Sequence, residues 1–110
     1  MKLVKANESQ YYDASKHFNC WTGHKLTAGQ DSQKITISYS HFLPNGGAEM
    51  SASPAERVYY VTEGSIVLKG KNNDVYQLNP GDMICIAPGE ERSVEVVGNE
   101  PATMLVIIVK

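Results

Sequence analysis

The sequence lacks most of the features that would set a small chain apart. Two cysteines in 110 residues are too few for a disulfide framework and fit a reducing compartment. No run approaches the roughly 20 apolar residues of a membrane-spanning helix, and the N-terminal MKLVKANESQ lacks a signal-peptide hydrophobic region. A formal net charge of −2 gives no electrostatic case for nucleic acid or an anionic membrane. We therefore expect a cytoplasmic protein with neither of these partners.

Helical periodicity is also scarce, and a period of two dominates. In KITISYSHFL (34–43), Ile35, Ile37, Tyr39 and His41 alternate with small polar residues, as in a half-buried strand. Turn residues follow at 44–47, and further apolar runs recur between Gly- and Pro-containing turns. These runs occupy residues 57–64, 65–70, 75–78, 83–87, 93–98 and 103–109. Short strands at this spacing predict an antiparallel all-β sandwich or barrel.

The first thirty residues do not share this pattern. The segment ESQYYDASKHFNC (8–20) is compatible with one or two helical turns or with an irregular arm. The length of the chain suits one domain. We therefore expect an N-terminal arm or short helix over residues 1–30, packed on a β-barrel over residues 31–110.

Two segments resemble the conserved motifs of the cupin family. PNGGAEMSASPAERVYYVTEG (44–64) resembles the first motif, which carries His-x-His and a glutamate before a closing glycine. NPGDMICIAPGEER (79–92) resembles the second, which runs from Gly-Asp through an apolar segment to a histidine. The resemblance implies a single-domain jelly-roll barrel and a homodimer that pairs through an exposed sheet and the N-terminal arm.

The resemblance fails at the positions that usually bind a metal. Aligned on the prolines and glycines, the two histidines of the first motif fall on Ser51 and Ser53, and its glutamate falls on Arg57. The histidine of the second motif falls on Arg92. Serine is a poor neutral ligand and a guanidinium has no lone pair to donate, so we expect no metal and no cofactor there.

Both arginines of the chain occupy these former ligand positions. Arginine suits bidentate recognition of carboxylate or phosphate, so a pocket holding Arg57 and Arg92 would bind a small anion such as a sugar acid or a phosphate. Ser51, Ser53 and Tyr39 would add hydrogen bonds. The alternative is structural: each arginine pairs with a nearby carboxylate or extends to the rim.

His41 is the best acid or base candidate, because it is the only histidine within the expected barrel strands and its pKa normally lies near neutrality. Its strand face, which carries Ile35, Ile37 and Tyr39, is expected to point into the barrel. Tyr59 would be its catalytic partner, since metal-free cupin epimerases use a histidine and tyrosine pair.

A third cluster lies in HFNCWTGH (17–24), where His17, Cys20 and His24 have spacings that zinc ligands can use. Three donors without a further partner more often pack, or line a pocket if the arm folds over the barrel mouth.

Three functions therefore remain open. The first is a metal-independent cupin that binds a small anion. The second is a metal-free isomerase, epimerase or lyase acting on a carbohydrate acid. The third is a metal enzyme with an atypical site drawn from His17, Cys20, His24 and His41. The sequence does not decide whether the protein is an enzyme.

Overall fold

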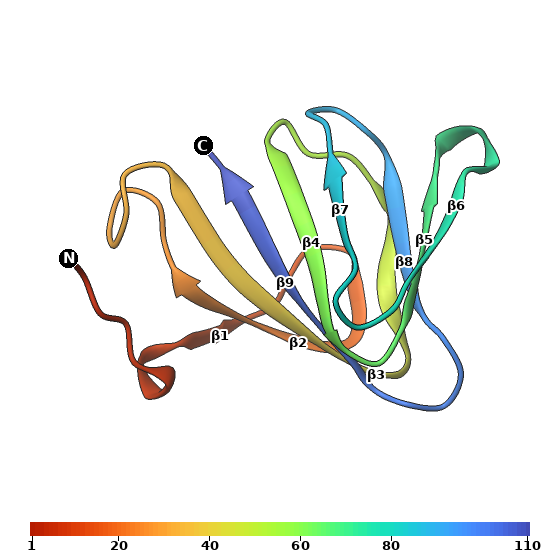
Figure 1. Cartoon of the computed structure of the whole chain (residues 1–110), viewed down its shortest axis with the longest axis horizontal. Helices are drawn as coiled ribbons and strands as arrows, with labels where there is room; N and C mark the ends of the chain where they lie inside the picture. Colours follow the sequence, from red (N-terminus) through yellow and green to blue (C-terminus); the bar gives the residue numbers. More distant parts are fainter.

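A computed structural model describes the backbone of residues 1–110 and every side chain except that of His24. It is an antiparallel, nearly closed β-barrel (Figure 1), which confirms the predicted all-β class. The nine strands are β1 (Gln10–Tyr12), β2 (His17–Leu26), β3 (Ile35–Ser51), β4 (Glu56–Glu63), β5 (Ile66–Gly70), β6 (Val75–Leu78), β7 (Met83–Ile86), β8 (Arg92–Val96) and β9 (Ala102–Val109). Two 3-10 turns, η1 (Ala6–Glu8) and η2 (Lys71–Asn73), complete the elements.

The strand order is β6-β5-β8-β3-β9-β4-β7, with β1 and β2 added beside β3. β3 belongs to both walls of the barrel. Its first half pairs with β2 and β9, and its last residues pair with β8 and with the start of β2. β9 lies between β3 and β4, so strands that are distant in sequence form the central part of one wall.

The turn expected at 44–47 is instead a bend within β3. Gly46 and Gly47 are buried, and a Cβ on either would meet a backbone carbonyl oxygen, of Asn19 and of Val94 respectively. These glycines therefore permit close backbone approach where β3 passes from one wall to the other, because only glycine leaves that space free.

The interior is apolar along most of the barrel. The largest fully buried side chains include those of Phe42, Ile66, Met104 and Val94, contributed by strands of both walls. Burying residues of this size contributes about 2 kcal/mol each, so the core supplies the main stabilisation of the fold.

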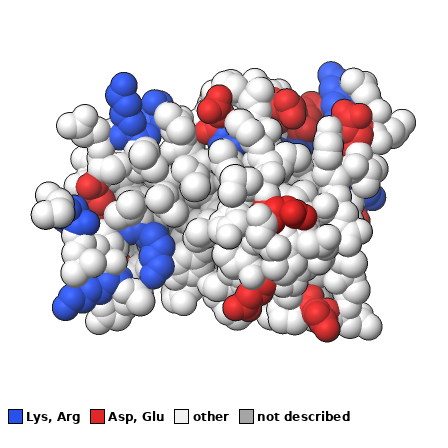
Figure 2. All heavy atoms as spheres, viewed as in Figure 1, with Lys and Arg blue, Asp and Glu red and all other residues white. Residues whose placement is uncertain are grey.

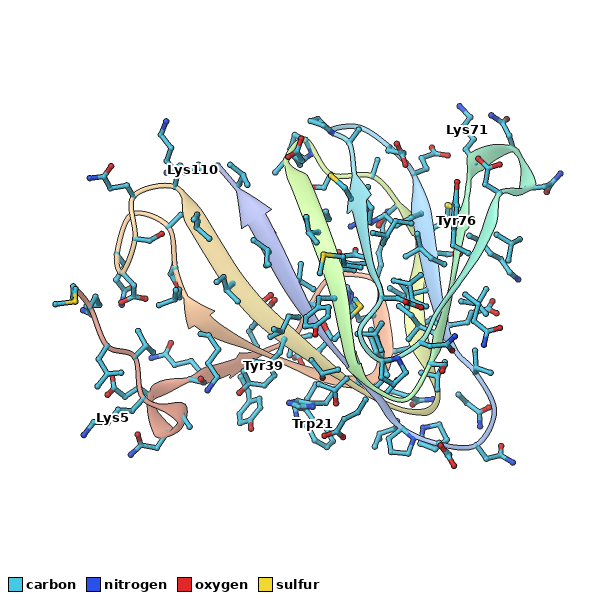
Figure 3. All side chains as sticks on the ribbon, in the orientation of Figure 1. Lys5, Trp21, Tyr39, Lys71, Tyr76 and Lys110 are labelled. Atoms are coloured by element: carbon cyan, nitrogen blue, oxygen red, sulfur yellow. The ribbon has the colours of Figure 1, made fainter. Side chains whose placement is uncertain are left out.

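The predicted facing of β3 is wrong. Ser38, Ser40 and Phe42 are buried and point inward, whereas the face that carries Tyr39 and His41 lies outside. Figure 3 shows Tyr39 and Trp21 projecting away from the barrel. The prediction failed because this sheet carries apolar residues on its outer face as well. Alternation within one strand does not show which of its two faces is buried.

The first thirty residues supply two of the strands. β2 pairs with β3 from His17↔Ala48 to Leu26↔Ile37, with a bulge at Asn19, whose φ of +48° is left-handed. β1 then pairs with β2. Within the described chain, no helix is long and apolar enough to cross a membrane.

The closing glycine of the first motif supports a stability prediction. Gly64 has a φ of +69°, and a Cβ there would lie directly against the carbonyl oxygen of Pro101. Gly98 has a φ of +70° with no atom within 4 Å of such a Cβ. Gly98→Ala should cost about 1–2 kcal/mol for the left-handed backbone alone. Gly64→Ala should cost roughly 1–3 kcal/mol more, because the backbone of the neighbouring segment must also move.

Urea denaturation of the two variants measures this difference in the free energy of unfolding. Equal losses in the two variants would show that the contact with Pro101 is not a constraint on the fold.

Candidate functional site

A cavity of about 410 Å³ lies inside the barrel. Strand β4 contributes Arg57 and Tyr59 to its wall, and β8 contributes Arg92. β3 contributes serines from both of its halves, and β9 contributes three apolar side chains. Residues 12–17, which connect β1 to β2, form the remaining side. The cavity has the size of ordinary small-molecule sites and is therefore the candidate functional site.

Arg92 is 8% exposed and is the only charged side chain buried to this degree among the described residues. Its Nε donates to the Tyr59 hydroxyl over 3.0 Å, which joins β8 to β4 across the barrel. Its Nη1 donates to the Ser51 carbonyl oxygen over 2.6 Å. Nη1 also lies 3.4 Å from the Ser51 hydroxyl. The two short hydrogen bonds use two of the five N–H groups, so three remain for other acceptors.

Arg57 is less completely satisfied. Its Nη2 donates to the Ser53 hydroxyl over 2.6 Å, while its Nε is buried and has no hydrogen-bond partner. The ion pairs found among the described residues are Lys2–Asp31 and Lys69–Glu95, and neither involves an arginine. The structural alternative, in which carboxylates neutralise the arginines, is therefore not what this part of the chain shows.

The cavity is consequently cationic. Lys16, Arg57 and Arg92 line it against one carboxylate, Asp13, which leaves two positive charges in excess among its charged side chains. The excess is local. On the face drawn in Figure 2 both signs occur, with Lys and Arg mainly toward the N-terminal end and Asp and Glu mainly in the other half.

The four positions that the cupin resemblance assigns to a metal all line this cavity. Ser51 and Ser53 accept or approach arginine N–H groups, and the two guanidinium groups present only donors. No group of three or more His, Cys, Asp or Glu side chains that could hold a metal ion occurs among the described residues, which exclude the His24 side chain. The donor set at this site therefore does not fit a divalent cation, which the arginines would repel.

His41 lies outside the cavity, contrary to expectation. Its ring contacts Tyr39 and Trp21 at centroid distances of 4.7 and 5.5 Å, and its Nδ1 is 3.0 Å from the Thr103 hydroxyl. Burial among these groups lowers the pKa of His41 below its usual value of 6.5, an effect that Glu63 partly opposes. Neither His41 nor Tyr39 can contact a molecule in the cavity from this face of the sheet.

His17 is the histidine that does line the cavity. It pairs with Ala48, which pairs in turn with the buried Val94, so the side chains of this row share the inner face. Its Nδ1 is 2.7 Å from the Ser15 carbonyl oxygen. Since a carbonyl only accepts, Nδ1 carries the hydrogen, and in the neutral ring Nε2 is the nitrogen that holds the lone pair.

The sequence offered one indication of His17, since its segment was expected to line the pocket if the arm folded over the barrel mouth. Sequence reasoning missed Ser38 and Ser40, which also line the cavity, because they were assigned to the outer face.

The two cysteines have no role at this site. Cys20 packs against the hydrophobic core, where burial raises the pKa of its thiol, and Cys85 is exposed on the outside of β7. A buried thiol with a raised pKa is a weak nucleophile and a weak metal ligand at neutral pH.

Comparison with known proteins identifies the family. The cupin domain family matches residues 38–108, about two thirds of the chain, and the chain belongs to it. No curated protein sequence matches it significantly.

Several solved structures share the fold. The polyketide cyclase RemF from Streptomyces resistomycificus superposes with a TM-score of 0.85 at 19% identity, covering 99% of this chain and 79% of that one. An RmlC-like cupin from Shewanella frigidimarina gives 0.77 at 11% identity, covering 96% and 86%. A domain of Drosophila melanogaster CENP-C gives 0.79 at 18% identity, covering 97% and 77%. At these identities the likeness shows the fold alone.

Proposed function

We propose that this cupin binds a small anionic molecule, a carboxylate, sugar acid or phosphate, between Arg57 and Arg92, without a metal ion. The observation that carries the proposal is the unpartnered Arg57 Nε. It is buried beside the cavity, and a buried N–H group on a charged side chain without an acceptor is costly. A bound oxyanion supplies that acceptor.

The surrounding groups support the same occupant. Arg92 is held rigidly by Tyr59 and Ser51 and still has donors to offer, so its charge is preorganised before a ligand arrives. Lys16 adds a third positive charge, from the segment that connects β1 to β2, and this charge also attracts an anion. A negatively charged ligand also removes the electrostatic cost of holding two arginines in one cavity.

Arg57→Gln should weaken anion binding about ten- to hundredfold, because it removes charge-assisted hydrogen bonds while keeping a polar, uncharged side chain. Lys71→Gln is the matched control, since it removes the same charge from an exposed residue outside the cavity. The measurement is the thermal shift and calorimetric titration of the wild-type protein and both variants. The probes are inorganic phosphate, citrate, lactate and glucuronate.

No probe that raises the melting temperature, or equal binding by Arg57→Gln and Lys71→Gln, would refute the anion site. One equivalent of a transition metal in the purified protein, found by elemental analysis, would refute the metal-free part of the proposal.

A second candidate function is proton transfer on the bound acid, and the position of His17 favours it. Its free Nε2 lone pair belongs to a ring that lines the same cavity as the arginines. In this function His17 takes a proton from a carbon next to a carbonyl group, and the resulting negative charge moves to the carbonyl oxygen. The proton then returns to carbon, so the step needs no oxidant or reductant.

Pyruvate in D₂O tests this activity, because transfer of a C3 proton to His17 and return of a deuteron removes the methyl signal from the proton NMR spectrum. His17→Gln should slow the exchange about a hundredfold or more. His41→Gln, which changes a histidine outside the cavity, should leave it unchanged. Exchange no faster than in buffer, or equal slowing in both variants, would exclude His17 as the base for this probe.

We also propose that the chain forms a homodimer through the outer face of β1, β2, β3 and β9. Here Ile37 pairs with Ile107 and Tyr39 with Leu105, all on the side opposite the inward serines. Farther along the same face are exposed aromatic and aliphatic side chains, those of Tyr11, Trp21 and Ile35. A continuous apolar sheet face of this kind suits an isologous contact, in which the same patch meets itself.

Trp21→Glu should convert the dimer into a monomer, because two copies of the charge would face an apolar surface without a partner. Val75→Glu is the control, an equally drastic change at an exposed residue of β6 on the other wall. Light scattering after gel filtration should give twice the 12.1 kDa chain mass for the wild type and the control. A monomeric wild type, or a dimeric Trp21→Glu, would contradict the assignment of this face.

A further inference from the structure

The floor of the cavity has two chemically different sides. Ser38 and Ser40 face inward from β3, and Met104, Val106 and Ile108 face inward from the neighbouring β9. The register places Ser38 opposite Val106 and Ser40 opposite Met104. Side chains paired in this way lie about 5 Å apart, so a row of hydroxyls runs directly beside a row of apolar groups.

Neither serine hydroxyl has a hydrogen-bond partner among the described parts of the chain, which exclude the His24 side chain. Ser38 and Ser40 are each 3% exposed, yet neither side chain hydrogen-bonds to any of the described residues. Thr22 provides the comparison, since it pairs with Ser40 across the strands, is equally buried, and donates its hydroxyl to the Tyr12 carbonyl oxygen. The two oxygens are not among the fully buried atoms that lack a hydrogen bond, so the hydroxyls are open to the cavity they line, and a molecule in that cavity is placed to supply their partner.

The strand register also separates the serines from Arg57. Tyr59 lies opposite Val106 on the β4 side, so one row across the floor reads Ser38, Val106, Tyr59. Arg57 lies one inward position farther along β4, opposite Ile108. The hydroxyl row and Arg57 are therefore on strands separated by β9, and the apolar side chains of β9 lie between them.

From this arrangement we propose that the ligand is an acid with an apolar middle and a hydroxyl or carbonyl oxygen remote from the acid group. Its anionic group binds Arg57 and Arg92, its apolar part covers Met104, Val106 and Ile108, and its remote oxygen hydrogen-bonds to Ser38 and Ser40. The inference rests on the proposed anion-binding function and adds to it the class of acid.

Matched pairs of acids that differ by one remote hydroxyl test the assignment. The probes are 4-hydroxybenzoate against benzoate and 4-hydroxyphenylacetate against phenylacetate, titrated by calorimetry. For the wild-type protein, the hydroxylated member of each pair should bind about three- to tenfold more tightly, the worth of one or two neutral hydrogen bonds.

The variants assign that preference to residues. In the double variant Ser38→Ala with Ser40→Ala, the two members of a pair should bind equally, because the remote hydroxyl loses its partners. This variant should remain folded, because replacing an unpartnered buried hydroxyl with a methyl group is neutral or stabilising. Ser93→Ala on β8, outside the cavity lining, should keep the preference.

Arg57→Gln separates the failure of this inference from the failure of the proposed function. It should weaken both members of a pair by the same factor. Binding that depends on Arg57 but shows no preference for the hydroxylated acid would mean that water satisfies the serines, which overturns the inference and leaves the anion site standing. If no acid binds in a way that Arg57 affects, both the anion site and the inference fail.

Discussion

The hydrogen bond from Arg92 to Tyr59 is the interaction on which the site depends. It joins the two walls of the barrel through a side chain that is almost fully buried and permanently charged. A buried charge is costly unless it is hydrogen-bonded, and the Ser51 carbonyl oxygen is the second acceptor that Arg92 uses. The same bonds that satisfy Arg92 also fix where its remaining donors point. Stability of the barrel interior and orientation of the site therefore have one origin.

The cationic cavity illustrates how a fold is kept while its chemistry changes. The positions that the cupin pattern uses for a metal still converge on one cavity, because the strands and glycines around them are retained. What has changed is the sign of the fixed charge. At the positions that the motif resemblance assigns to metal ligands, this cavity presents guanidinium groups, and this is the basis for the anionic ligand proposed above.

The sequence was sufficient for the fold and for part of the site. Turn residues at regular spacing and two recognisable motifs predicted the barrel. The motif alignment also predicted that Ser51, Ser53, Arg57 and Arg92 would lie together, as the structure places them.

The facing of β3 could not be predicted, because both faces of that wall carry side chains that suit a strand, and a shift of one residue exchanges inside for outside. His41 was therefore assigned to the interior and Ser38 to the exterior, the reverse of the structure. The place of His17 in the cavity could not be predicted for a different reason. It depends on the pairing of β2 with β3 across a bulge, and the local sequence pattern does not indicate that bulge.

The place of β9 between β3 and β4 has a consequence for how the chain reaches its folded state. Those two strands do not pair with each other, so a nascent chain that ends before residue 102 leaves both with an open edge. Open edges on apolar strands recruit other chains. During synthesis, the protein therefore passes through a stage in which β3 can pair with β2 and β8, and β4 with β7, while the edge of each that faces β9 has no partner. Its dependence on chaperones should be concentrated in the interval before the β9 segment emerges from the ribosome.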